Sequence, residues 1–190
     1  MSYFTIKEGI RFDVNKDLCE MPFREFHKLS QNSLKIIKRN MTNLTTSESI
    51  RLLKGNYTGH LGYIYQDKPY VLPITYYYDK DDHSLISYSA DGHKIDAMRQ
   101  NTAVTLLVEE VKSSNNWQSV MAHGTYEELQ GTDAKFKLHQ FTEGVKGLIL
   151  AKEHRETEFI SEFSSKLYSR GIPTVYRIKI LEITGKRKET

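Results

Sequence analysis

Cysteine is almost absent from this chain of 190 residues, because Cys19 is the only one. A single cysteine excludes an internal disulfide and suits a reducing compartment. Long apolar runs are missing too, since stretches such as 104–108 and 147–151 are far too short to cross a membrane. Charges within the first eight residues do not fit a signal peptide. We therefore expect a cytoplasmic protein.

An excess of charge of one sign is lacking as well. The formal net charge is only +3, and basic residues are interleaved with acidic ones, which gives no basis for nucleic-acid binding. The sequence has no Gly-x-Ser-x-Gly elbow, no P-loop and no Gly-x-Gly-x-x-Gly after a strand. Its seven histidines show no zinc-type spacing. Any chemistry is therefore expected to come from a bound cofactor.

What is present is the pattern of a globular domain, with 38% hydrophobic and 27% charged residues. We interpret residues 1–40 as an N-terminal extension packed on the domain, and residues 41–190 as the domain itself. Antiparallel strands with helices inserted between them predict an α+β, mainly β fold built on a small barrel. Strands are expected over 58–66, 69–78, 84–90, 102–111, 117–129 and 174–183, and helices from a capping box at 45–48, near 95–99, and over 132–143 and 154–170.

One predicted strand, 69–78, carries its own proline, Pro73. Proline cannot donate to a strand ladder, so a neighbouring N–H or C=O group near Pro73 could meet the polar edge of a ligand ring. The alternative is an edge strand that proline protects against aggregation.

The next strand turns through Gly92 into a short helix that begins with His93 and Lys94. A helix N-terminus binds anions through its free N–H groups, and Lys94 would add a full charge there, with Ser89 and His93 as further donors. The alternative is an ordinary turn in which Asp91 caps the helix and Lys94 is solvated.

A third candidate lies on the predicted strand 117–129, where Trp117 and Ser119 share one face. They could form an aromatic wall and a hydroxyl donor for a ligand. A tryptophan packed at the end of a hairpin explains the same pattern equally well.

Taken in order, the segments 59–62, 69–74, 87–96 and 117–120, followed by Gly124, resemble the pyridoxamine 5′-phosphate oxidase-like split β-barrel proteins. Within these, the resemblance is greatest to the branch containing the nitroimidazole-resistance proteins, and it runs from about Met41 to Lys186. It implies a six-stranded antiparallel split β-barrel with peripheral helices. It also implies a homodimer that binds flavin mononucleotide (FMN) in two clefts at the dimer interface. The residues that the resemblance assigns to the flavin are Leu72, Pro73, Ile74, Thr75, Tyr88, Ser89, Ala90, His93, Lys94, Trp117, Gln118, Ser119 and Val120.

The activity implied by the resemblance is that of an FMN-dependent oxidoreductase acting on nitroaromatic or quinone-like molecules. Two alternatives stay open: a flavin carrier or sensor without turnover, and a haem-binding barrel with His60 or His123 as ligand. Tyr88 stands where many members of the branch have histidine, and His93 stands where arginine is frequent. The substrate residues of pyridoxamine phosphate oxidation are not recognisable, so we do not expect that reaction. No residue is assigned a catalytic role, and no metal site is expected.

Overall fold

The computed structural model describes residues 3–5, 11–13, 41–156 and 173–189, and the chain divides into two compact units, 1–42 and 43–190. In the first unit, β1 (Tyr3–Thr5) and β2 (Arg11–Asp13) pair antiparallel. Most of the predicted N-terminal extension, including Cys19, lies outside the described residues. Its packing on the domain therefore stays a prediction.

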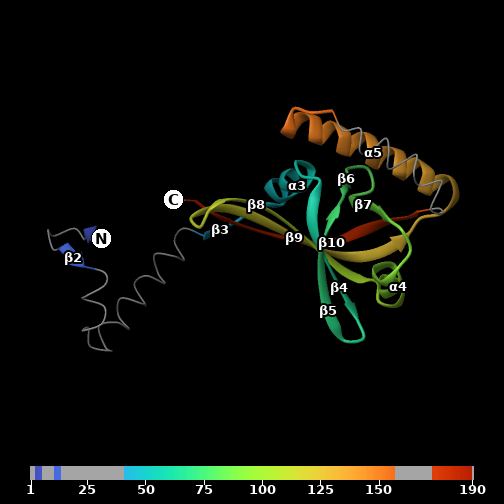
Figure 1. Cartoon of the computed structure of the whole chain (residues 1–190), viewed down its shortest axis with the longest axis horizontal. Coiled ribbons are helices and arrows are strands. Elements are labelled where there is room, and N and C mark those ends of the chain that lie inside the picture. Colours follow the sequence, from blue (N-terminus) through green and yellow to red (C-terminus); the bar gives the residue numbers. More distant parts are fainter. Residues whose placement is uncertain (1–2, 6–10, 14–40, 157–172, 190) are drawn as a thin grey trace. The chain divides into compact units, whose positions relative to one another are not determined.

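The second unit is built on a closed antiparallel barrel (Figure 1). Its hydrogen-bonded strand order is β5-β4-β8-β9-β10-β7-β6. Only Tyr76 separates β5 from β6, so the two ends of this order are parts of one broken strand and the sheet closes as six strands. The predicted six-stranded split barrel is thereby confirmed. The strands are β3 (Met41–Asn43), β4 (Thr58–Tyr65), β5 (Lys68–Thr75), β6 (Tyr77–Asp79), β7 (Ser84–Ser89), β8 (Ala103–Ser113), β9 (Asn116–Glu128) and β10 (Thr174–Lys188).

In the described part of the chain, three helices lie outside the barrel: α3 (Thr46–Lys54), α4 (His93–Gln100) and α5 (Gly131–Glu153). The predicted capping box opens α3, where the Thr45 hydroxyl accepts from the Glu48 N–H and the Glu48 carboxylate accepts from the Thr45 N–H. The predicted helix 154–170 falls almost wholly outside the described residues. Its first residue, His154, instead ends α5 in the left-handed conformation.

Helix α5 continues ten residues beyond the predicted end at 143, through Gly144 and Gly147. Glycine is a weak helix former, so sequence patterning favours a stop there. In the fold, the Tyr77 ring of β6 packs directly on Gly144, where an added Cβ would lie 2.1 Å from Tyr77 Cε2. Tertiary packing against β6 therefore outweighs the local preference.

Two apolar clusters hold these elements together. The larger cluster fills the barrel and includes fully buried Leu61, Tyr76, Leu106 and Tyr176. The smaller one lies between α5 and the barrel and contains Ile86, Leu129, Phe141, Val145, Ile149 and Val175.

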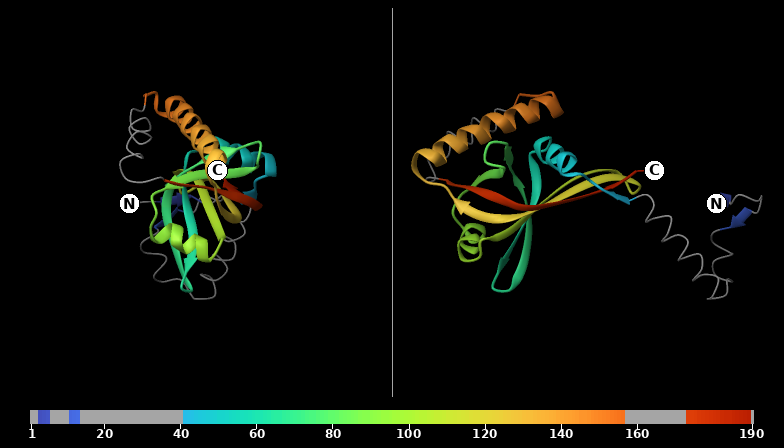
Figure 2. Two further views of the ribbon diagram at one scale, coloured as in Figure 1. Left: turned by 90° about the vertical axis from the view of Figure 1, so that its right-hand side faces the viewer. Right: turned by 180° about the vertical axis from the view of Figure 1, so that it is seen from behind.

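Strand β10 is the longest in the sheet and runs five residues past its predicted end at Ile183 (Figure 2). Its beginning pairs with the end of β7, where Thr174 faces Ser89. Its other end pairs with the start of β9, where Lys188 faces Trp117. The register shifts between Ile180 and Glu182, which is the signature of a β-bulge.

Candidate functional site

Lys94 lies in the first turn of α4, beside a helix start that is open to a ligand. The N-cap is Gly92, and no side chain of the described residues caps the helix. The first N–H groups of a helix have no intrahelical partner and carry partial positive charge. The Lys94 side chain is half-buried, and it forms no ion pair or hydrogen bond with any residue that the structure describes. Burial lowers the pKa of Lys94, as expected for a cation without a counter-ion.

The carboxylate of Asp91 turns away from this helix start. Asp91 Oδ1 accepts hydrogen bonds from the Thr174 hydroxyl at 2.7 Å and from the Arg99 guanidinium at 3.1 Å. Together these contacts hold the pKa of Asp91 below its usual value. The alternative that Asp91 is the N-cap is wrong, because its carboxylate is committed to Thr174 and Arg99.

His93 is surrounded by tyrosines from the β4–β5 hairpin. Its ring centroid lies 4.7 Å from that of Tyr65 and 5.0 Å from that of Tyr70, and Nδ1 lies 3.3 Å from the Tyr63 hydroxyl. Tyr63 and Tyr70 stack with centroids 5.4 Å apart. His93 therefore anchors α4 to the hairpin, and its contact with a phosphate stays a prediction.

The proline-bearing segment lies on β5, which among the described strands pairs only with β4. Pro73 is exposed and faces His60 across the ladder, whereas Ile74 is buried in the barrel. At the end of the strand, the Ser87 hydroxyl of β7 donates to the Thr75 carbonyl at 2.8 Å. The free edge of β5 thus lies between the tyrosines that contact His93 and the strand that leads to Ser89.

Tyr88, Ser89 and Ala90 join this group at the end of β7. Tyr88 packs edge-on against Phe141 of α5 with ring centroids 5.1 Å apart. Burial raises the pKa of Tyr88 to about 12, so its phenol stays protonated at neutral pH. Ser89 is half-buried and Ala90 is exposed. The structure therefore places Tyr88, Ser89 and Ala90 directly before the start of α4, and Thr75 of β5 lies beside the same strand.

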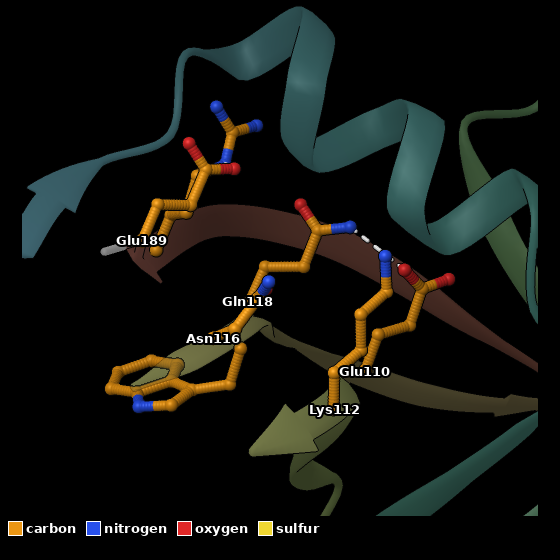
Figure 3. A pocket seen from close by; sticks show the side chains of 7 residues that line it. Glu110, Lys112, Asn116, Gln118 and Glu189 are labelled. Carbon is orange, nitrogen blue, oxygen red and sulfur yellow. Dashed lines mark hydrogen bonds and ion pairs between the residues drawn. The ribbon is translucent and has the colours of Figure 1, made fainter. Parts of the chain in front are cut away.

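The other four predicted residues lie on β9. Figure 3 shows one of them, Gln118, beside Glu110. Trp117, Gln118 and Ser119 are half-buried, whereas Val120 is fully buried and its side chain faces the barrel core. Trp117 and Gln118 line a small cavity of about 80 Å³ together with Glu110, Lys112, Asn116, Arg187 and Glu189.

Strand β10 measures the separation of Ser89 from Trp117. Ser89 lies against its first residue and Trp117 against its last, fourteen residues later. At ~3.3 Å per residue this corresponds to about 45 Å along the strand, far more than the length of one FMN molecule. A single copy of the chain therefore does not bring Ser89 and Trp117 around one flavin, whereas Pro73 of β5 lies in the ladder row of Met121, two residues from Ser119.

Three residues of these sites escaped the sequence analysis: Arg99, Thr174 and Glu110. Arg99 and Thr174 hold Asp91, and Glu110 accepts a hydrogen bond from Gln118 Nε2 at 2.8 Å. The hairpin register could have found Glu110, because a turn at 113–116 places it opposite Gln118. Thr174 required the long-range pairing of β10 with β7.

Within the described part of the chain, no group of three or more His, Cys, Asp or Glu residues is arranged to hold a metal ion. No described helix is both long and apolar enough to span a membrane.

Comparison with known proteins shows extensive similarity over the barrel. The family model for pyridoxamine 5′-phosphate oxidase matches residues 45–187. A protein of Rhizobium meliloti (strain 1021), RA0666, is 42% identical over 66 residues, which cover 35% of this chain and only 42% of that relative.

Among solved structures, an FAD-binding protein from Mesorhizobium loti has a TM-score of 0.57 at 27% identity, covering 79% of this chain and 98% of that one. A candidate 5-nitroimidazole antibiotic resistance protein from Bacteroides thetaiotaomicron has a TM-score of 0.55 at 16% identity, covering 77% of this chain and 88% of that one. The FAD-binding protein from Mycobacterium smegmatis has a TM-score of 0.53 at 16% identity, covering 78% of this chain and 100% of that one. At 16% identity, the last two similarities concern the fold.

Proposed function

Because the chain belongs to the pyridoxamine 5′-phosphate oxidase family, we propose that it is a homodimeric FMN-binding oxidoreductase that reduces nitroaromatic or quinone-like small molecules. The observation that carries this proposal is Lys94, a half-buried cation that has no counter-ion among the described residues and lies beside the start of α4. A phosphate would supply the missing negative charge and accept from the free N–H groups of the helix.

The residues of the barrel fit an FMN molecule in chemical terms. Lys94, Ser89 and the start of α4 would hold the phosphate, and the diversion of Asp91 to Arg99 and Thr174 removes the nearest carboxylate from it. The unpaired edge of β5 around Pro73 offers backbone groups to the polar edge of the ring. When bound, the flavin would supply the electron transfer, and the chain would supply binding, orientation and exclusion of water.

Tyr88 lines the same end of the barrel and keeps its proton at neutral pH, because burial raises its pKa to about 12. It is therefore not a general base.

The separation of Ser89 from Trp117 along β10 supports the homodimer. Trp117, Gln118 and Ser119 would contribute to the flavin held by Lys94 of a second copy, giving two equivalent sites related by twofold symmetry. The outward face of the sheet also exposes large apolar side chains, including Val71 at 70% and Val111 at 64%, which a second copy would cover.

The first experiment is a visible absorption spectrum of the purified chain, followed by titration of the flavin-free protein with FMN, FAD and riboflavin. FAD is the competing cofactor, because the Mesorhizobium loti protein is FAD-binding. We expect flavin bands that co-elute with a dimer, and FMN to bind most tightly. A protein that retains no flavin would overturn the proposal, and a sharp Soret band would replace the flavin with haem.

Turnover is tested separately, by anaerobic reduction with a nicotinamide cofactor and reoxidation by a nitroaromatic compound or a quinone. We expect both half-reactions to proceed with bound FMN. Tight FMN binding with neither half-reaction would instead make the chain a flavin carrier or sensor.

A further inference from the structure

The side-chain amide of Gln118 is held in one orientation by Glu110. Gln118 Nε2 donates to Glu110 Oε2 at 2.8 Å across the β8–β9 hairpin. An ionised carboxylate only accepts hydrogen bonds, so the NH₂ group of Gln118 must face Glu110. The carbonyl oxygen of Gln118 then faces away from Glu110, as Figure 3 shows.

Glu110 is itself held by Asn56 in the loop after α3 and by Lys152 of α5. Asn56, just after α3, donates from Nδ2 to Glu110 Oε1 at 3.0 Å and to the Leu52 carbonyl at 2.9 Å. Lys152 of α5 donates to Asn56 Oδ1 at 2.5 Å and lies 3.9 Å from Glu110 Oε1. Both carboxylate oxygens of Glu110 therefore have a donor.

The charge on Glu110 is also stabilised. Burial by itself raises the pKa of this carboxyl, but the hydrogen bonds from Gln118 and Asn56 and the charge of Lys152 outweigh it and leave the pKa below its usual value. Glu110 thus stays an acceptor at neutral pH, and Gln118 cannot turn its carbonyl toward it without repulsion.

The carbonyl oxygen of Gln118 accepts no hydrogen bond from the described residues. Gln118 lines the 80 Å³ cavity beside Trp117 and is among the residues expected to reach a flavin. The fixed amide therefore presents an acceptor, and an acceptor selects a ligand group that can donate. In an oxidised flavin, such groups are the imide N–H of the ring and the hydroxyls of the ribityl chain.

We propose that Glu110 is a positioning residue that holds the Gln118 amide so that its carbonyl oxygen accepts a hydrogen bond from a donor group of the bound flavin. The inference rests on the proposed function and names a residue that makes no contact with the flavin itself. A purely structural role for Glu110, as a link between the hairpin and α3, predicts no dependence on Gln118.

The test is a double-mutant cycle of Glu110→Gln and Gln118→Ala, read as the Kd of FMN from quenching of flavin fluorescence. Glutamine at position 110 keeps the size but lets the two amides pair in either orientation. We expect each single variant to weaken FMN binding on the order of tenfold, and the double variant to be no weaker than Gln118→Ala alone. The matched control is Glu143→Gln, an exposed acid of α5 that pairs only with neighbouring Lys146.

The outcomes separate the inference from the proposed function. If the unmodified protein binds no flavin, the proposed function fails and the positioning role fails with it. If it binds FMN but Glu110→Gln has no effect, or if the two effects simply add, only the positioning role is overturned. Thermal unfolding of each flavin-free variant shows whether a lost affinity reflects lost folding.

A second readout identifies the donor group on the flavin. With FMN methylated at the ring imide nitrogen, Gln118→Ala should cause no further loss if that N–H is the donor. An undiminished loss would assign the hydrogen bond to a ribityl hydroxyl. If Gln118→Ala weakens the binding of neither FMN nor the methylated FMN, the proposal is overturned.

Discussion

At the scale of single residues, Lys94 is the clearest mark of function in this chain. The other prominent cations of the barrel have acidic partners: Arg99 pairs with Asp91 and Glu128, and buried Lys137 pairs with Asp79 and Asp82. Lys94 is half-buried and has no such partner among the described residues. A cation that is kept from water without a counter-ion costs free energy in the flavin-free protein, and a bound phosphate would recover it.

Replacing Lys94 with alanine should weaken FMN binding by about 1.5–3 kcal/mol, or roughly 10- to 150-fold, if its ammonium bonds the phosphate. The same change should leave riboflavin binding almost unaltered, because riboflavin has no phosphate. Isothermal titration of both ligands measures the difference. Lys135→Ala, which removes an exposed lysine of α5, is the control and should change neither affinity. Equal losses for both flavins would place Lys94 away from the phosphate.

FMN affinity should also depend on pH through Lys94. Burial lowers the pKa of Lys94 in the flavin-free protein, and a phosphate beside it would raise that pKa again, so binding takes up a proton. The affinity is then full below the lowered pKa and falls as the pH rises through it toward the ordinary value of about 10.5. Kd values measured from about pH 7 to about pH 10 test the prediction. Lys94→Ala supplies the baseline, and a slope that persists in this variant would belong to another group.

At the scale of elements, α5 shows how a neighbouring strand decides the extent of a helix. Gly144 and Gly147 lie one turn apart, but only Gly144 is covered by the Tyr77 ring. Gly147 is exposed, and a Cβ there would meet nothing within 4 Å. The two glycines therefore have opposite expected responses to the same substitution.

Gly147→Ala should stabilise the protein by about 0.5–1 kcal/mol, because alanine is the better helix former and has room at this position. Gly144→Ala should be less stable than Gly147→Ala by about 1–3 kcal/mol, because its methyl group must displace Tyr77 from the helix. Urea unfolding of the two variants measures this difference directly. Equal stabilities would show that Tyr77 moves aside at no cost.

At the scale of the whole molecule, the length of β10 bears on the proposed dimer. Ser89, which precedes the helix of Lys94, lies at its beginning, and Trp117 lies at its end. In the proposed dimer, each flavin is therefore held by Lys94 of one copy and Trp117 of the other. Variants that each lack Lys94 or Trp117 should therefore complement each other.

Lys94→Ala and Trp117→Ala homodimers should both bind FMN weakly. Mixing the two after subunit exchange yields heterodimers in which one site has both native residues and the other has neither. Random pairing makes half of the dimers mixed, so about one quarter of all sites should regain tight binding. Flavin titration of the mixture counts these sites, and the Lys94→Ala/Trp117→Ala double variant is the control. No recovery after verified exchange would contradict a site shared between chains.

Local patterns in the sequence were enough for most of the fold. The capping box at Thr45 and Glu48 depends on residues three apart, and the alternation within the strands depends on neighbours two apart. The proline of β5 and the glycine before α4 likewise marked the free edge and the open helix start. The patterns alone predicted a small barrel, and the resemblance to split-barrel proteins added that this barrel is a six-stranded split barrel.

Contacts between distant segments decided the rest, because their partners cannot be read from any short window. The sequence left open whether Asp91 would cap α4, and only the approach of Thr174 on β10 and of Arg99 turned its carboxylate away. The sequence pattern predicted that α5 ends at 143, but the Tyr77 ring packs on Gly144 and the helix continues through this residue. The candidate residues were predicted from sequence as one set, but the span of β10 separates Ser89 from Trp117. Local chemistry thus determined which residues we predict to suit a flavin, because each of those features depends on a short segment. The tertiary structure decided how far apart these residues lie, because that distance depends on the pairing of distant strands.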